Sequence, residues 1–191
     1  MKLFTIISFT ILLLVSCEPT KRERQIIGKW SYSSTYTDNI KSNDVLTGTM
    51  TYLIENVDEF CDDFTEKEFG TFQIFFNLFF NDNDVPYTVI LEYDTDYQGI
   101  WSLDGDEIVL KGDYCTFKFS KGYPLDPKAN QDVEYYVKQL KAYTDTAIVQ
   151  PIIDTLIEEH KAEVFELSND KLNLKYEVEP VMQTLNKIKK Q

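Results

Sequence analysis

Apolar and polar residues alternate along much of the chain between residues 26 and 120, and clusters of Gly, Asn and Asp separate the alternating runs. In the clearest run, residues 71–80, every second side chain is large and apolar: Phe72, Ile74, Phe76, Leu78 and Phe80. Successive side chains of a strand point to opposite faces of the sheet, so this period of two predicts strands with one buried face. The pattern therefore predicts an antiparallel β protein.

Two hairpins are predicted within this region. Residues 71–80 and 87–95 flank Asn-Asp-Asn-Asp at 81–84, residue types that tolerate turn conformations. Asp104-Gly105 lies between two apolar runs, which is a strong hairpin signal. Strand character is present at residues 27–37, 47–57, 71–80, 87–95, 99–103, 107–111, 114–120, 162–167 and 171–178. The predicted fold is mostly β, an antiparallel barrel of eight or nine strands, because that number is enough for closure.

Residues 130–161 follow a different pattern, with apolar side chains at helical spacing. The two stripes are Val133, Tyr136, Val137 and Leu140, then Val149, Ile152, Ile153 and Leu156. Pro151 fits the first turn of the second helix, where its missing N–H is not needed. We expect a two-helix insertion, 130–161, before the last two strands, with each helix covering an apolar surface.

The N-terminus has the features of a secretion signal. Lys2 precedes a mainly apolar run, residues 4–15, and small Ser16 follows it. A run of about 12 residues is too short to span a bilayer, which needs roughly 20. With Cys17, the sequence Leu14-Val15-Ser16-Cys17 resembles the lipobox of bacterial lipoproteins. That resemblance implies cleavage before Cys17 and acylation of its thiol, with palmitate among the attached chains, so that the membrane is the expected partner.

These patterns divide the chain into four parts. We expect a signal peptide at 1–16, a tether at 17–25, a barrel domain at 26–180 with the helical insertion, and a basic tail at 181–191. The expected location is the cell envelope, at the outer membrane rather than the inner one, facing the periplasm or the cell surface. Several acyl chains hold a protein stably on a membrane, whereas one binds reversibly.

The charge balance is acidic, with 19 basic and 32 acidic residues and a net charge of −13. Nucleic-acid binding selects for a basic surface, so we expect no nucleic-acid partner. No protein partner is indicated.

Cys61 and Cys115 remain after Cys17 is assigned to lipid. An even number of cysteines in an oxidising compartment favours a Cys61–Cys115 disulfide. The alternative is two buried thiols that pack as small apolar side chains.

Gly28-Lys29-Trp30 opens the first predicted strand, and residues 99–106 form a Gly- and Asp-rich hairpin. Together with the meander, these motifs resemble bacterial lipoproteins with a lipocalin-like, calycin-type domain. The resemblance implies that Trp30 closes one end of the barrel and that Gly28 permits tight entry of the strand. It also implies a cation from the last strand over the indole; since Arg22 and Arg24 precede the first strand, Lys171 or Lys175 is expected there.

Aromatic residues make up 14% of the chain, which is more than a small filled barrel requires. Phe72, Phe76, Tyr87 and Tyr93 are expected to face inward and could line a cavity for a small apolar ligand. The alternative is a solid core, because small barrels commonly fill themselves with side chains.

The sequence offers little support for catalysis. His160 is the single histidine and lies at the end of a helical apolar stripe, so no catalytic residue, metal site or cofactor is predicted. Residues 94–99, Asp-Thr-Asp-Tyr-Gln-Gly, only partly match a calcium loop and are interpreted as a polar turn. A solvated segment between strands is predicted for Asp62, Asp63, Glu66 and Glu68.

The expected function is therefore that of a non-enzymatic, lipid-anchored envelope lipoprotein that binds a small apolar ligand in its barrel. The alternative is a protein-interaction or accessory module that uses residues 130–161 as its contact surface.

Overall fold

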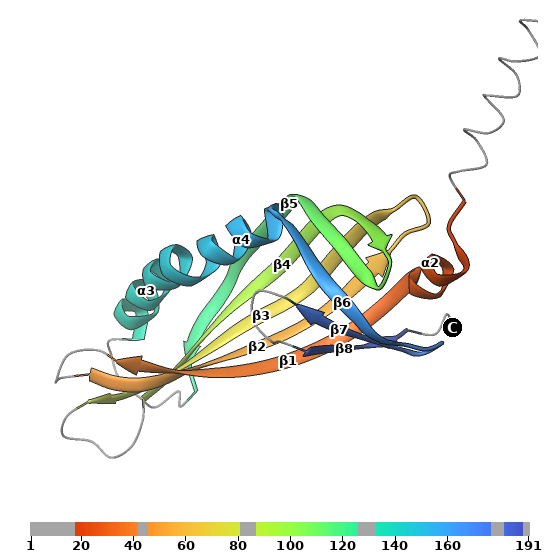
Figure 1. Cartoon of the computed structure of the whole chain (residues 1–191). Helices are drawn as coiled ribbons and strands as arrows, with labels where there is room; N and C mark the ends of the chain where they lie inside the picture. Colours follow the sequence, from red (N-terminus) through yellow and green to blue (C-terminus); the bar gives the residue numbers. More distant parts are fainter. Residues whose placement is uncertain (1–17, 42–45, 81–86, 126–132, 177–181, 189–191) are drawn as a thin grey trace, which may run out of the picture.

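Eight antiparallel strands form a closed ring in the computed structural model, which describes residues 18–41, 46–80, 87–125, 133–176 and 182–188 (Figure 1). The strands are β1 (Gly28–Lys41), β2 (Leu46–Phe60), β3 (Thr65–Phe80), β4 (Tyr87–Asp104), β5 (Glu107–Pro124), β6 (Glu159–Leu167), β7 (Lys171–Tyr176) and β8 (Met182–Lys187). Each strand pairs with the next, and β8 pairs with β1. The prediction of a mostly β, antiparallel barrel is confirmed. The predicted signal peptide and Cys17 lie outside the described residues.

The strands are longer than the sequence pattern predicted. β4 and β5 have 18 residues each, and each contains two of the predicted runs. The register of β4 on β5 shifts between Glu92 and Tyr93 and again between Gln98 and Gly99, so polar interruptions there are bulges rather than turns. Both predicted hairpins form, and Gly105, with a φ of +61°, supplies the left-handed residue of the β4–β5 turn.

The ring closes through short ladders at one end only. β1 pairs with β8 at Trp30 and Ser31, and β5 pairs with β6 over five residues, from Glu107 to Lys111. Beyond these ladders, β1 to β5 continue as a long curved sheet (Figure 1). Two separate cores result from this construction, one at the closed end and one under the helices.

The closed-end core consists of Ile26, Trp30, Phe60, Trp101, Ile108, Leu110, Ala162, Val164, Leu172, Leu174 and Leu185. The helix-covered core consists of Met50, Phe72, Ile74, Phe76, Leu78, Val89, Leu91, Tyr93 and Val149. Side chains from the helical insertion pack against the second core: Val137, Leu140, Ile148, Ile152 and Ile153.

The helical insertion is continuous. α3 (Val133–Thr144), the π-helical segment η1 (Asp145–Val149) and α4 (Gln150–Ile157) follow one another along the sheet (Figure 1). The widened turn η1 directly precedes Pro151, whose ring would clash with the carbonyl four residues earlier in a regular α-helix. Three strands follow the helices, not two as predicted, because residues 182–187 form β8. Among the described residues, none of the helices is long and apolar enough to cross a membrane.

Both predicted flanking segments contribute to the barrel domain. Lys21–Ile26, of which residues 21–25 were assigned to the tether, forms helix α2, whose Thr20 and Glu23 make a reciprocal capping box. Ile26 is fully buried, and its carbonyl accepts a hydrogen bond from Trp30 Nε1 at 2.6 Å. The first part of the predicted basic tail is β8, which contributes buried Leu185. The prediction that these segments lie outside the domain is wrong for 21–25 and for 182–187, because both pack on the closed end.

Candidate functional site

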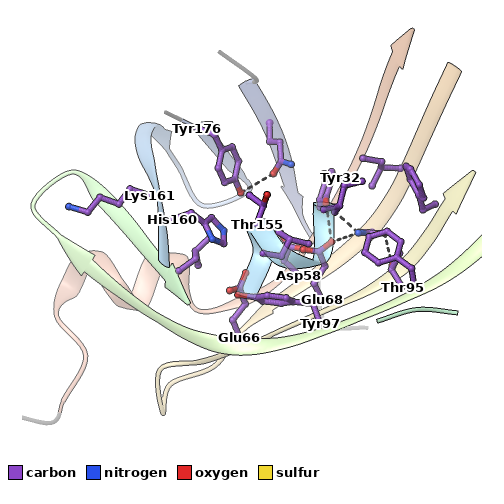
Figure 2. Close-up of a pocket in the computed structure, with 18 residues that line it drawn as sticks. Tyr32, Asp58, Glu66, Glu68, Thr95, Tyr97, Thr155, His160, Lys161 and Tyr176 are labelled. Atoms are coloured by element: carbon purple, nitrogen blue, oxygen red, sulfur yellow. Dashed lines mark hydrogen bonds between the residues drawn. The ribbon is translucent and has the colours of Figure 1, made fainter. Parts of the chain in front are cut away.

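A cavity of about 270 Å³ lies inside the barrel, between the two cores (Figure 2). Its wall includes Leu110 of the closed-end core and Phe72 of the helix-covered core. Helix α4 contributes Ile152, Thr155 and Leu156. The cavity is therefore lined by strands and by the helical insertion together.

Three acidic side chains line this cavity, which we call the carboxyl cluster: Asp58, Glu66 and Glu68. Asp58 on β2 is opposite Glu68 on β3, and Glu66 lies two residues earlier on the same face of β3. The alternation that points Phe72 and Phe76 inward also points these two glutamates inward. The prediction of a solvated segment is therefore wrong for Glu66 and Glu68, whereas Asp62 and Asp63 are exposed in the β2–β3 turn.

Glu68 is held by a hydrogen-bond network. Its Oε1 accepts from Tyr32 Oη at 3.0 Å and from Asn56 Nδ2. Asn56 Oδ1 in turn accepts from Thr95 Oγ1 at 3.2 Å. Burial raises the pKa of Glu68, and the two hydrogen bonds partly oppose that rise.

Other polar side chains of the wall have fewer hydrogen bonds than Glu68, namely Asp58, Glu66 and Tyr97. Asp58 Oδ1, Glu66 Oε2 and Tyr97 Oη are buried and have no hydrogen-bond partner among the described residues. The three residues are only 4%, 3% and 4% exposed. Leaving such atoms without partners costs free energy, and native proteins rarely do so. We call these three atoms the unpartnered oxygens.

The pKa values of the cluster reflect its burial and its crowding. Burial raises the pKa of Asp58 and of Glu66 well above their ordinary values, and neighbouring carboxyls raise both further. Burial raises the pKa of Tyr97 as well, with added contributions from Glu66 and Glu68. Among the described residues, no Lys or Arg forms an ion pair with the cluster.

The nearest basic side chains of the wall come from β6. Lys161 lines the cavity, but its Nζ pairs with Glu107 at 3.5 Å, and Figure 2 shows it extending away from the carboxyls. His160 belongs to β6, not to the end of a helix, and also lines the cavity. Its Nδ1 is 3.1 Å from the carbonyl of Glu158, and its ring lies 6.2 Å from that of Tyr176.

The cavity differs from the predicted apolar pocket. Of the four aromatic residues expected in its wall, only Phe72 lines it. Phe76 and Tyr93 are buried in the helix-covered core, and Tyr87 packs against that core. Tyr93 Oη donates to Asp145 Oδ1 at 2.9 Å, which joins η1 to the barrel. The apolar part of the wall is instead Ile54, Phe72, Leu110 and Phe117, with Ile152 and Leu156 from α4.

Trp30 and Gly28 lie at the closed end, and neither lines the cavity. Trp30 is completely buried, and Lys187 Nζ lies 4.8 Å from the centre of its ring. Lys187 also donates to the Gln25 carbonyl at 2.9 Å. The cation over the indole is therefore Lys187, not Lys171 or Lys175, because the last strand is β8. Gly28 has a φ of +136°, and a Cβ there would lie 3.0 Å from Lys187 Cε.

The two remaining cysteines are both free thiols in the structure, so the predicted disulfide is not formed. Cys61 is half-buried just after β2, whereas Cys115 is buried on β5 opposite Tyr97. Burial raises the pKa of Cys115 to about 11. The alternative of a buried thiol therefore holds for Cys115, which is 9% exposed.

Metal binding has no support in the described part of the chain, where no group of three or more His, Cys, Asp or Glu side chains could hold an ion. Residues 94–99, interpreted as a polar turn, are part of β4, with Asp94 and Asp96 on its exposed face.

Fold and site together define an eight-stranded antiparallel barrel with a helical cover and an internal cavity that is acidic on one part of its wall and apolar on another. In comparisons with known proteins, no family model matches the chain and no curated protein matches its sequence.

Proposed function

We propose that the protein is a lipid-anchored binding protein of the bacterial cell envelope, with a lipocalin-like barrel, that holds a small ligand in its cavity. The observation that carries the proposal is the set of unpartnered oxygens in the cavity wall, on Asp58, Glu66 and Tyr97. A ligand that bonds to these atoms would offset the free energy that their burial costs. The helical cover suits such a role, since α4 forms part of the wall.

The anchor is proposed from the sequence Leu14-Val15-Ser16-Cys17. We expect Cys17→Ser to abolish labelling of the protein by a radioactive fatty acid in the producing cell. A Cys17→Ser variant that is still labelled would contradict the anchor without affecting the proposal for the cavity.

The position of the helical insertion favours ligand binding over the alternative of a protein-interaction module. An interaction module should present an apolar helix face to its partner. Here five apolar residues of the insertion, among them Val137, Leu140 and Ile152, pack on the helix-covered core, whereas Tyr135, Tyr143 and Ile157 are exposed. Its apolar stripe is thus used within the barrel.

The binding function can be tested by releasing co-purifying small molecules from the full chain and weighing them by mass spectrometry. Leu156→Trp should fill the cavity from α4 and lower the amount of bound ligand at least several-fold. The matched control is Ile157→Trp, since Ile157 is the next residue, is 41% exposed and does not line the cavity. Equal ligand content in both variants would contradict the proposal.

A further inference from the structure

We infer that the ligand is a small amphiphilic amine, with a protonated amino group bound at Asp58, Glu66 and Tyr97 and a short apolar body against Phe72 and Phe117. This inference rests on the proposed function, because it names the chemical class that the same cavity binds.

The hydrogen-bonding capacity of the wall indicates a donor. Glu68 Oε1 is already occupied by Tyr32 and Asn56, whereas Asp58 Oδ1 and Glu66 Oε2 accept nothing from the described residues. An ammonium group has three N–H donors and no acceptor. Three donors correspond to the three unpartnered oxygens, since the hydroxyl of Tyr97 can also accept.

The charge of the wall indicates the sign of the ligand's charge. The cluster places three carboxyls in one cavity. Of the two basic residues of the wall, Lys161 is engaged by Glu107, and His160 Nδ1 lies 3.1 Å from the Glu158 carbonyl. Buried charges in proteins are normally paired, and an unpaired one is costly. A cation would lower this cost for all three carboxyls, whereas an anionic ligand would add to it.

The aromatic part of the wall is consistent with a cation. The phenol groups of Tyr32, Tyr97 and Tyr176 all face the cavity (Figure 2). Aromatic rings attract cations through their faces, most strongly where water is excluded. Tyr97 comes from β4 and is not one of the three carboxyls, and its buried hydroxyl is also without a partner among the described residues.

Volume and apolar surface indicate the rest of the ligand. A cavity of about 270 Å³ is slightly smaller than the range of roughly 300–1,000 Å³ typical of drug-sized ligands. The apolar wall, with Ile54, Phe72, Leu110 and Phe117, suits a short hydrocarbon or a single aromatic ring. A polyamine would place a second charge against this apolar surface, so a monoamine fits better.

Three probes of the same shape test the inference: 2-phenylethylamine, 2-phenylethanol and phenylacetate, which differ mainly in charge. Calorimetry with the detergent-solubilised full chain at pH 7 should show binding of the amine at least tenfold tighter than the alcohol. Phenylacetate should not bind. Equal affinity for amine and alcohol would overturn the inference and leave ligand binding in the cavity supported.

Variants complete the test. Glu66→Gln should weaken binding of the amine at least tenfold and leave the weak binding of the alcohol unchanged. Asp58→Asn provides the same test from β2 should Glu66→Gln fail to fold. The matched control is Glu55→Gln, an exposed glutamate of β2, which should bind all probes as the wild type does. If no probe binds, or if Glu55→Gln and Glu66→Gln behave alike, the inference is overturned; the mass-spectrometric comparison of Leu156→Trp with Ile157→Trp still decides the proposed function separately.

Discussion

The buried tryptophans of the closed end and the carboxyls of the cavity are neighbouring groups that differ in how their polar atoms are satisfied. At the closed end, Trp30 Nε1 donates to Ile26, and Trp101 Nε1 donates to the Cys61 carbonyl at 3.1 Å. In the cavity, by contrast, buried oxygens of Asp58 and Glu66 have no partner among the described residues. The two kinds of residue are directly adjacent, since Trp30 on β1 is opposite Asp58 on β2.

This contrast separates residues that stabilise the fold from residues available to a ligand. A cation is already in place over Trp30, where Lys187 belongs to the chain itself. The carboxyl cluster has no such residue among the described ones. We therefore expect substitutions at the closed end to reduce stability and substitutions in the cluster to preserve or increase it.

The largest effect is expected at Trp30. Trp30→Ala should lower the free energy of unfolding by about 3–5 kcal/mol, because it removes a completely buried aromatic side chain and leaves a void. Urea unfolding of wild type and variant measures this change. Tyr36→Ala is the control on the same strand, where Tyr36 is 60% exposed, and should cost about 1 kcal/mol or less. Similar losses for both variants would contradict the role of Trp30 in closing the barrel.

The cluster should produce a dependence of stability on pH. Because the folded pKa values of Asp58, Glu66 and Glu68 are raised, the folded state binds more protons than the unfolded state. The stability that these three carboxyls contribute is therefore greatest below the unfolded pKa of about 4 and is lost as the pH rises through their folded values. A tenfold difference in proton affinity between the folded and unfolded states of one carboxyl corresponds to about 1.4 kcal/mol. The melting temperature should therefore fall by several degrees as the pH is raised.

Glu66→Gln should flatten this pH profile. The stability of the variant relative to wild type should rise as the pH is raised from 5 to 8, because the raised pKa of Glu66 makes the wild type lose stability with increasing pH and glutamine does not titrate. The other titratable groups of the wall remain in the variant: Asp58, Glu68, Tyr32, Tyr97, Tyr176, His160 and Lys161. The control is Glu55→Gln, since Glu55 is exposed. A profile for Glu66→Gln as steep as that of wild type would assign the pH dependence to other groups.

A smaller effect is expected at Lys187. Lys187→Met should cost about 1 kcal/mol, because it removes the cation over Trp30 and the hydrogen bond to Gln25. Lys171→Met is the matched control, since Lys171 pairs with Glu166 at the surface and such pairs contribute about 0–1 kcal/mol. A larger loss of stability for Lys171→Met than for Lys187→Met would indicate that the cation over Trp30 comes from β7.

No effect is expected from reduction of the protein. Cys61 and Cys115 are free in the structure, so adding a reductant should leave the melting temperature and the gel mobility unchanged. Alkylation of the folded protein should modify Cys61 before buried Cys115. A mobility shift on reduction would restore the disulfide that the sequence favoured.

The alternation of large apolar residues predicted the barrel because it depends only on the period of two in a strand. The alternation did not predict the first part of β3, which includes Glu66, for two physical reasons. Gly70 interrupts the run, since a Cβ there would overlap the backbone of β2. Inward-facing glutamates also have the same polarity as outward-facing ones, so the pattern does not distinguish a solvated segment from an acidic cavity wall.

Strand β8 and its lysine were missed for a related reason. Leu185 is the one apolar side chain among residues 183–187 of β8. The strand therefore shows no apolar alternation. The cation over Trp30 was consequently sought at Lys171 or Lys175. The partnering of Lys187 depends on β8 returning to β1, which is a contact between distant parts of the chain.

The contrast between the two regions is tested most directly by titrating the side-chain carboxyl groups by carbon-13 NMR, with Glu66→Gln and Asp58→Asn to assign the signals. We expect Asp58 and Glu66 to titrate well above about 4, the ordinary value of a side-chain carboxyl. Ordinary titration of Asp58 and Glu66 would contradict a buried, unneutralised carboxyl cluster, and with it the proposed site for a cationic ligand.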